Sequence, residues 1–372
     1  MQWNSMNLPE TITHTPVLDI IDSSKLKTFE RCPRKFFWRY VCGWEPQGSN
    51  IHLEFGSAWH LAMEHLLING YSVKSIKDAW TLLNNHYRLH FPPEEDIIHA
   101  PKNPENAMVA LMGYVEQYGR TDDFKVLYTE VAGSVPITND KEITFKMDGV
   151  IQDDNGISIL EHKTSSRDSA AWHAQWPLSL QTGTYTHALH SLFSMNEIYS
   201  VIVNGAFLRK KGNGFSRDVV HFSFDQLNIW LNRVKTLIAQ IDWCYNMICE
   251  PGAIDAEVMV GFPICGEACT DFGKSCTYHD FCQAWPNPLR RCGVVQGGFK
   301  WNHWDPTVQD EVAKYHLNKD GIINHVRPTR VTPERSEPSL DGSNVDDFGA
   351  NISSSTLVDD LSELQKNSWL NI

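Results

Sequence analysis

Residues 142–163, EITFKMDGVIQDDNGISILEHK, carry the clearest structural pattern in the sequence. They contain two runs rich in β-branched and aromatic residues, 142–151 and 157–163, which flank the strong turn sequence DDNG. A similar run at 126–137 precedes them and ends in a second turn sequence, Thr138-Asn139-Asp140. The three runs are therefore predicted to form an antiparallel three-stranded meander.

Helical patterns lie on both sides of this meander. Before it, helices are expected at 24–41, 53–67, 73–90 and 104–119. After it, we expect a helix at 177–192, strands at 199–210 and 215–224, and a long helix at 225–248. This order predicts a mixed α/β domain with a central sheet flanked by helices, extra helices at its N-terminal side, and a Cys-rich segment at its C-terminal side.

Composition places the chain among soluble globular proteins. Hydrophobic residues make up 42% of the 372 residues, and no apolar run is long enough to cross a bilayer. No signal peptide is apparent, so a cytoplasmic protein of a bacterial or phage-infected cell is expected. We divide the chain into an N-terminal extension (1–22), one domain (23–325) and an acidic tail (326–372) that is expected to be disordered and could bind a protein partner.

The net charge of −13 would by itself disfavour a nucleic-acid partner. Its distribution changes this reading, because eight acidic and two basic residues in 333–372 contribute −6 of the total. The segment from Lys25 to Arg39 instead interleaves six basic residues with four aromatic ones, a mixture that suits single-stranded nucleic acid. We expect its aromatic side chains to lie mostly in the core. Arg209-Lys210-Lys211 forms a second basic cluster.

Two carboxylates and a lysine end the second and third strands of the meander. Asp148 lies near the end of one strand, and Glu161-His162-Lys163 ends the next. Because side chains alternate along a strand, Glu161 and Lys163 should share a face and His162 should point away. Paired carboxylates suit Mg²⁺, and a nearby lysine can orient water and offset phosphate charge. As an alternative without catalysis, Asp148-Gly149 would be a simple turn, and Glu161 and Lys163 would lie on a solvated strand face.

Two helical motifs accompany this trio. Gly56 precedes His60 by four residues, and Gln181 precedes Tyr185 by the same spacing, so each pair lies on one helical face. Taken alone, His60 could be a satisfied core histidine and Tyr185 could serve only in packing.

Together and in this order, these residues resemble the RecB-like branch of the PD-(D/E)XK nuclease superfamily, over roughly residues 24–285. The resemblance implies a restriction-endonuclease-like core that binds Mg²⁺ or Mn²⁺. It implies that the metal ligands are His60, Asp148, Glu161 and the carbonyl of His162. Lys163 would be the catalytic lysine, and Gln181 and Tyr185 would position DNA or that lysine. Glu130, on the first strand, is a lesser candidate for a role at the metal.

The nine cysteines include a close trio, Cys269, Cys276 and Cys282, in the segment 265–292. Thiolates this close suggest zinc or an iron–sulfur cluster, with either Cys265 or Cys32 as the fourth ligand. Members of the RecB-like family, including the AddB subunit and the CRISPR adaptation nucleases, bind a 4Fe–4S cluster through one early and three late cysteines. The resemblance thus implies a cluster on Cys32 and the trio, although the first spacing of the trio is longer than the commonest family spacing. Zn²⁺ with Cys265 is the alternative.

The remaining cysteines, Cys42, Cys244, Cys249 and Cys292, are expected to be ordinary buried thiols. As a whole, the sequence predicts a metal-dependent exonuclease acting on single-stranded DNA or duplex ends in recombination, repair or replication. The chain shows no phosphate-binding loop of the helicase type, and in this respect it resembles the stand-alone RecB-like nucleases that phages encode. The alternatives are a DNA-binding iron–sulfur or zinc-stabilised subunit without turnover, and a zinc-stabilised interaction protein.

Overall fold

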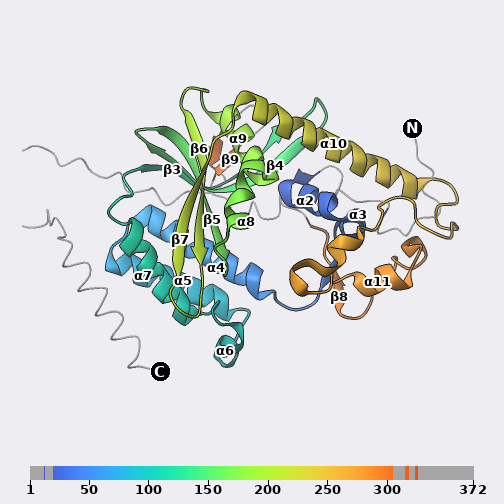
Figure 1. Cartoon of the computed structure of the whole chain (residues 1–372), viewed down its shortest axis with the longest axis horizontal. Coiled ribbons are helices and arrows are strands. Elements are labelled where there is room, and N and C mark those ends of the chain that lie inside the picture. The colour runs from blue at the N-terminus through green and yellow to red at the C-terminus, as the bar shows by residue number, and fades with distance from the viewer. Residues whose placement is uncertain (1–11, 13–19, 305–314, 318–322, 326–372) are drawn as a thin grey trace, which may run out of the picture.

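The structure, a computed structural model, describes Ile12, residues 20–304 and the segments 315–317 and 323–325. Its centre is an eight-stranded mixed sheet in the order β10-β9-β3-β4-β5-β6-β7, with β1 pairing with β4 beside this path (Figure 1). The strands are β1 (Ile21–Asp22), β3 (Lys125–Pro136), β4 (Glu142–Asp153), β5 (Gly156–Ser165), β6 (Ile198–Phe207), β7 (Gly214–Val220), β9 (Tyr315–Leu317) and β10 (Ile323–His325). A separate pair joins β2 (Trp44–Pro46) to β8 (Phe299–Trp301).

The predicted meander is confirmed, since β3, β4 and β5 pair antiparallel in chain order. The DDNG turn is held by the Asp153 carboxylate, which accepts from the Asn155 N–H at 2.8 Å. From this turn the β4–β5 ladder runs as far as the pair Gly149–Leu160 and ends there. Beyond that point β5 continues beside β6, which runs parallel to it. The two strands therefore part at a fork, and the next residues along them carry the predicted carboxylates.

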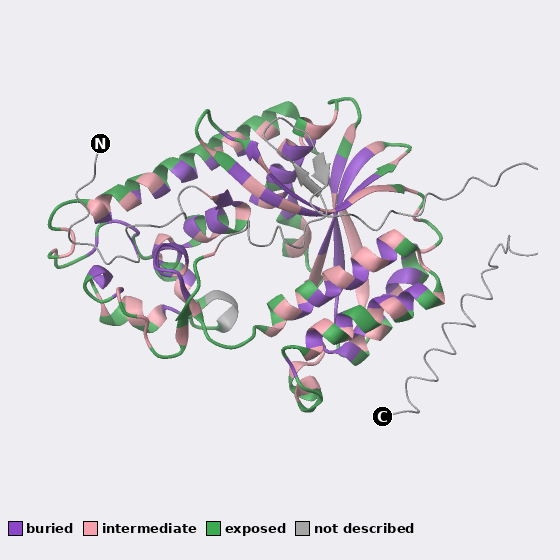
Figure 2. Ribbon diagram, turned by 180° about the vertical axis from the view of Figure 1, so that it is seen from behind, coloured by how far each residue is buried: buried purple, intermediate pink, exposed green. Residues whose placement is uncertain are grey.

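Helices cover both faces of the sheet (Figures 1 and 2). One layer consists of α4 (Ile51–Asn69), α5 (Val73–Arg88) and α7 (Pro104–Tyr118), whose apolar side chains form one core cluster. The other contains α9 (Leu180–Leu192) and α10 (Phe224–Cys249), which pack on each other and share a larger core with the sheet. These helices confirm the predicted mixed α/β fold with extra N-terminal helices. The shorter helices are η3 (Pro93–Glu95), α6 (Asp96–His99), α8 (Ala170–Ala174), η4 (Trp176–Leu178), η5 (Gly266–Gly273), α11 (His279–Ala284) and η6 (Pro288–Arg290).

The packing of α9 against α10 depends on Gly183. A Cβ atom at this position would lie 2.2 Å from Cδ1 of Trp230, so only glycine permits this approach. The Trp230 indole N–H also donates to the carbonyl of Leu180 at 3.1 Å. These contacts fix α9 over the sheet, and they set the positions of Gln181 and Tyr185.

The basic segment is not the single helix expected at 24–41. It consists of α2 (Ser23–Arg31), a break at Cys32, α3 (Pro33–Phe36) and a π-helical turn, η2 (Phe37–Val41). Cys32 adopts an extended conformation (φ −160°, ψ 107°), as expected for a residue before proline, and the helix restarts at Pro33.

Two of the six basic residues of this segment are buried. Lys25 and Arg34 are each 2% exposed. The Lys25 ammonium donates to the carbonyl of Ile20 at 2.6 Å, and the Arg34 guanidinium donates to that of Phe262 at 2.8 Å. Because buried cations need such partners, these two serve the fold. The segment's four aromatic residues are buried, as predicted: Phe29, Phe36, Phe37 and Trp38.

The Cys-rich segment contains three short helices, η5, α11 and η6. Its position beside the N-terminal helices is fixed by aromatic contacts. Phe262 stacks on Phe36 at 6.0 Å between ring centroids, and the Trp38 indole lies 5.6 Å from the ring of Phe281. The start and the end of the domain are thereby packed together, as Figure 1 shows for the blue α3 and the orange α11.

Most of the predicted extension (1–22) and all of the predicted acidic tail (326–372) lie outside the described residues. Within the described residues, none of the helices combines the length and the apolar character that spanning a bilayer requires.

Candidate active site

Asp148 lies at the fork between β4 and β5 and binds two partners there. Its Oδ1 lies 2.9 Å from Nδ1 of His60 on α4, and its Oδ2 accepts from the main-chain N–H of His162 at 2.7 Å. This second hydrogen bond links β4 to β5 just beyond the last residue pair of the β4–β5 ladder. Asp148 thereby joins the helix α4 to both strands of the fork.

Glu161 is the centre of a second group of side chains. Its Oε1 accepts from the Lys163 ammonium and, at 3.0 Å, from the Gln181 amide. The same Gln181 amide donates to the Tyr185 hydroxyl at 2.8 Å, and that hydroxyl donates to the Lys146 carbonyl on β4 at 2.7 Å. The predicted face shared by Glu161 and Lys163 is therefore present, and α9 covers it with the two residues of the Gln-x-x-x-Tyr motif.

The charges of the two groups influence one another. Burial and then the nearby Asp148 carboxylate raise the pKa of Glu161. Burial would raise the pKa of Asp148 as well, but His60 and the other nearby cationic groups outweigh it, so that pKa is lowered. Burial would lower the pKa of Lys163, yet Glu161 and Asp148 raise it, which keeps the ammonium charged. The site thus holds two carboxylates of unlike basicity beside a fixed cation.

These residues meet the chemical requirements of a divalent-metal site. Oε2 of Glu161 is buried and has no hydrogen-bond partner, an arrangement that costs free energy unless a cation or a donor binds there. His60 adds an imidazole nitrogen to the two carboxylates, and its Nδ1 lies at hydrogen-bonding distance, 2.9 Å, from Oδ1 of Asp148.

Within the part of the chain that the structure describes, ligand atoms of His60, Asp148 and Glu161 do not all lie within 4.8 Å of one another. Glu161 is turned toward Lys163 instead.

His162 points to the opposite side of β5, as the strand alternation predicts. One of its ring nitrogens, Nδ1, lies 2.9 Å from the side-chain nitrogen of Asn204 on β6, which also donates to the Tyr114 hydroxyl at 2.9 Å. Burial lowers the pKa of His162 to about 3, so its ring is neutral. Asn204 could not be predicted from the sequence, because it is 42 residues from His162 and reaches it only through the parallel pairing of β6 with β5.

Glu130 occupies a strained position opposite the fork. Its φ of +51° lies in the left-handed region, which is unfavourable for a residue with a Cβ. The residues on either side of it pair with Gly149 and Met147, which places it across from Asp148. The carboxylate lies 2.6 Å from the Lys146 ammonium, and burial raises its pKa to about 7. Glu130 thus contacts the lysine whose carbonyl holds Tyr185.

The cysteines of the predicted cluster come from both ends of the domain. Cys32 is 7% exposed, and Cys282 accepts from the Trp38 indole N–H at 3.4 Å. The main-chain N–H of Cys276 donates to the carbonyl of Cys269 at 2.7 Å. Among the described residues, no three cysteine sulfurs lie within 4.8 Å of one another, as the sulfurs around one zinc ion would. Of the thiols expected to be buried, Cys42, Cys244 and Cys292 are, whereas Cys249 is half-buried.

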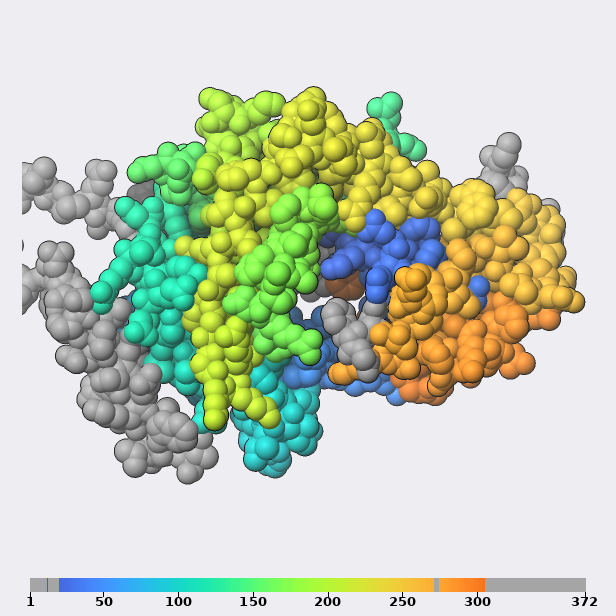
Figure 3. Space-filling view, in the orientation of Figure 1, coloured from blue at the N-terminus to red at the C-terminus, as the bar shows by residue number. Residues whose placement is uncertain are grey.

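The surface is hollowed between the green residues of α8 and the blue residues of α2 and the start of α4 (Figure 3). Lys27 of α2 lies close enough to the fork that Lys163 helps to lower its pKa, after burial as the first cause. Gly56, one turn before His60 on α4, faces open space, since an added Cβ would have no neighbour within 4 Å. The predicted cluster Arg209-Lys210-Lys211 follows β6, where Arg209 lies 3.5 Å from Asp168.

A family model described as "PD-(D/E)XK nuclease superfamily" matches residues 23–283, which include the fork and both helical motifs. The chain belongs to the PD-(D/E)XK nuclease superfamily. No curated protein matches the sequence. A solved structure titled "Crystal structure of SSO0001" is similar at 11% identity over 65% of this chain and 91% of that chain, with a TM-score of 0.26. That likeness is too slight to support an argument.

Membership of the PD-(D/E)XK superfamily makes the chain a nuclease, a hydrolase that uses divalent metal ions. It also agrees with the mixed sheet flanked by helices. The family match extends neither to the iron–sulfur branch nor to a particular mode of cleavage.

Proposed function

We propose that this PD-(D/E)XK nuclease is a DNA exonuclease dependent on Mg²⁺ or Mn²⁺. The observation that carries the proposal is the fork, where β4 and β5 stop pairing and present Asp148 and Glu161 beside Lys163. His60, Asp148, Glu161 and the carbonyl of His162 would hold the ion. When bound, the ion would polarise the scissile phosphate and lower the pKa of a water molecule.

The other side chains of the fork would then act on the substrate. The Lys163 ammonium, held charged beside Glu161, would offset negative charge on the phosphate and orient the attacking water. Gln181 and Tyr185 would keep Glu161 and Lys163 in place, because each is bonded to the group around Glu161. Asn204 would fix the His162 ring, and with it the backbone that binds Asp148.

Support for DNA as the substrate comes from the hollow beside the fork. Lys27 provides a cation near Lys163, and Gly56 leaves the adjacent face of α4 open. Lys35 and Arg31 of the N-terminal helices are exposed basic residues as well. An exonuclease would receive a strand end in the hollow between α2, α4 and α8 (Figure 3). Recombination, repair or replication, in a phage or its host, is the setting we propose.

A time course on DNA labelled at the 5′ or the 3′ end tests this mode of action. We expect one label to be released at once as mono- or short oligonucleotides, while the other stays on fragments that shorten progressively. Covalently closed circular DNA should resist cleavage. Early cleavage of the closed circle, or the same internal fragments from both labels, would show an endonuclease and contradict this part of the proposal.

We also propose a 4Fe–4S cluster on Cys32, Cys269, Cys276 and Cys282. Its support is that one thiol lies in the N-terminal helices and three in the segment packed against them, so a cluster would link the two ends of the domain. Anaerobically purified protein should be brown and contain four irons per chain. Cys32→Ser should lose the colour, and Cys265→Ser should keep it. Colourless protein with one zinc, lost in Cys265→Ser, would assign zinc to the segment instead.

A further inference from the structure

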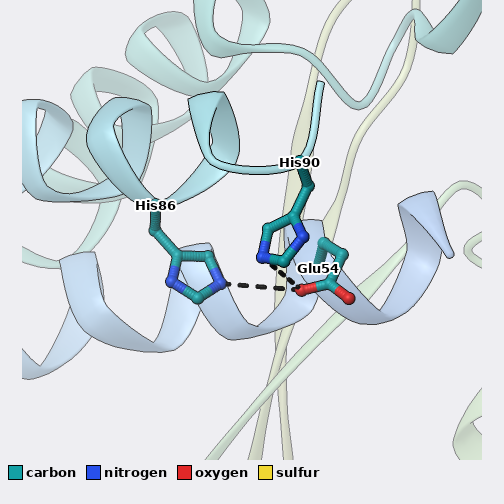
Figure 4. Close-up of side chains that lie close together, drawn as sticks. All are labelled: Glu54, His86 and His90. Atoms are coloured by element: carbon teal, nitrogen blue, oxygen red, sulfur yellow. Dashed lines mark ion pairs between the residues drawn. The ribbon is translucent and has the colours of Figure 1, made fainter. Parts of the chain in front are cut away.

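A second group of potential metal ligands lies on the helical layer formed by α4 and α5. It contains Glu54 near the start of α4, His86 in the last turn of α5, and His90 two residues beyond the end of α5. One ligand atom from each residue lies within 4.8 Å of the other two. Figure 4 shows the two imidazoles directed at the carboxylate from the same side.

The distances in this group are compatible with three ligands of one ion. Oε2 of Glu54 lies 3.2 Å from Nε2 of His90 and 3.8 Å from Nε2 of His86. In a tetrahedral zinc site with bonds of about 2.0–2.1 Å, two ligand atoms lie about 3.3 Å apart. The longer separation exceeds a hydrogen bond, and Nε2 of His86 is buried without a hydrogen-bond partner. A metal ion between the three residues would satisfy that nitrogen.

A neighbouring hydroxyl can also orient one of the two imidazoles for metal binding. Nδ1 of His90 lies 3.2 Å from the Ser49 hydroxyl, so this hydroxyl can accept a hydrogen bond from Nδ1–H and leave the Nε2 lone pair free to bind a metal. Such a bond to the second ring nitrogen is usual for metal-binding histidines. His86 and His90 are four residues apart, a spacing that places two imidazoles on one side of a helix end. Simple ion pairs with Glu54 would leave the buried Nε2 of His86 unexplained.

We propose that Glu54, His86 and His90 form a zinc site, separate from the carboxylate fork. Two imidazoles and one carboxylate suit Zn²⁺ and similar transition metals, whereas Mg²⁺ prefers oxygen ligands. His90 is exposed, so water would complete the coordination. The ion would cross-link the start of α4 to the end of α5. Because His60 lies on the same helix, this cross-link would also stabilise one wall of the active site.

The test is zinc uptake by the full chain after treatment with a chelator. Zinc per chain is measured after dialysis against dilute Zn²⁺, together with the rise in Tm caused by Zn²⁺. The variants are His86→Ala, His90→Ala and Glu54→Gln. His99→Ala is the matched control, because His99 pairs with Glu95 four residues earlier on a helix without a third ligand nearby. The readout is the difference from the native chain, because the cysteines and the fork can also bind zinc.

We expect each variant to retain one zinc fewer than the native protein and to lose the zinc-dependent rise in Tm, while His99→Ala keeps both. Changing a residue that only orients a ligand weakens metal binding by about 10–100-fold, so loss of a ligand should weaken it at least as much. If His86→Ala fails to fold, the exposed His90→Ala and the near-isosteric Glu54→Gln decide the question. Native zinc content and a native Tm response in those two variants would overturn the proposal.

Discussion

Replacing Glu161 with glutamine is expected to reduce DNA cleavage by about 1000-fold or more. Oε2 of Glu161 is buried at the fork without a hydrogen-bond partner, and we propose that it binds the metal ion. Glutamine has nearly the same shape but no negative charge, so the substitution removes a charged ligand. Loss of metal-based stabilisation worth about 4 kcal/mol in the transition state corresponds to this factor. The measurement is the single-turnover cleavage rate of labelled DNA at saturating Mg²⁺.

Glu142→Gln is the matched control for this substitution. Glu142 lies on the neighbouring strand β4, but it is exposed and its carboxylate accepts from the Ser134 hydroxyl at the end of the strand away from the fork. We expect this variant to cleave at the native rate. Native cleavage by Glu161→Gln, with a native circular dichroism spectrum, would show that Glu161 is not a metal ligand.

Replacing Asp122 with alanine is expected to lower the free energy of unfolding by about 3–5 kcal/mol. Its carboxylate, with a side chain only 2% exposed, accepts from the Arg217 guanidinium at 2.8 Å and from the Tyr71 hydroxyl at 2.6 Å. Arg217 also donates to the Tyr114 hydroxyl and lies 3.9 Å over the Tyr118 ring. Without Asp122, a largely buried cation would be left without its counter-charge.

The matched control is Asp78→Ala, which removes an exposed carboxylate from an ion pair with Lys74 on α5. Solvent screens such a pair, so little change is expected. Urea unfolding followed by circular dichroism gives both values. A cost for Asp122→Ala no larger than that for Asp78→Ala would show that the buried network beneath β7 contributes little to stability.

Much of the fold could be predicted because its signals are local. The turn sequence DDNG and the β-branched runs beside it specify the meander, and helical periodicity specifies α4, α5, α7 and α10. The short strands β1, β2 and β8 could not be predicted in this way. Each has two or three residues and forms only because distant segments meet, as where Trp44 pairs with Trp301.

The same distinction applies to the candidate site. Motif spacing predicted Asp148, Glu161 and Lys163 as site residues. In the structure, Gln181 contacts the Glu161 carboxylate and His60 contacts the Asp148 carboxylate. Residues that act through tertiary contacts carried no comparable signal. The sequence shows Lys25 and Arg34 as part of a basic face, yet both are buried, because their partners are carbonyl groups that only the folded chain brings close.

We propose that the fork is the catalytic centre of this metal-dependent nuclease. Its most direct test compares native protein, Asp148→Ala and Lys163→Ala on labelled DNA, each with Mg²⁺ and with excess chelator. We predict cleavage by the native protein only, in Mg²⁺ only, with both variants folded but inactive. Undiminished cleavage by both variants, or native cleavage in the presence of chelator, would contradict this claim.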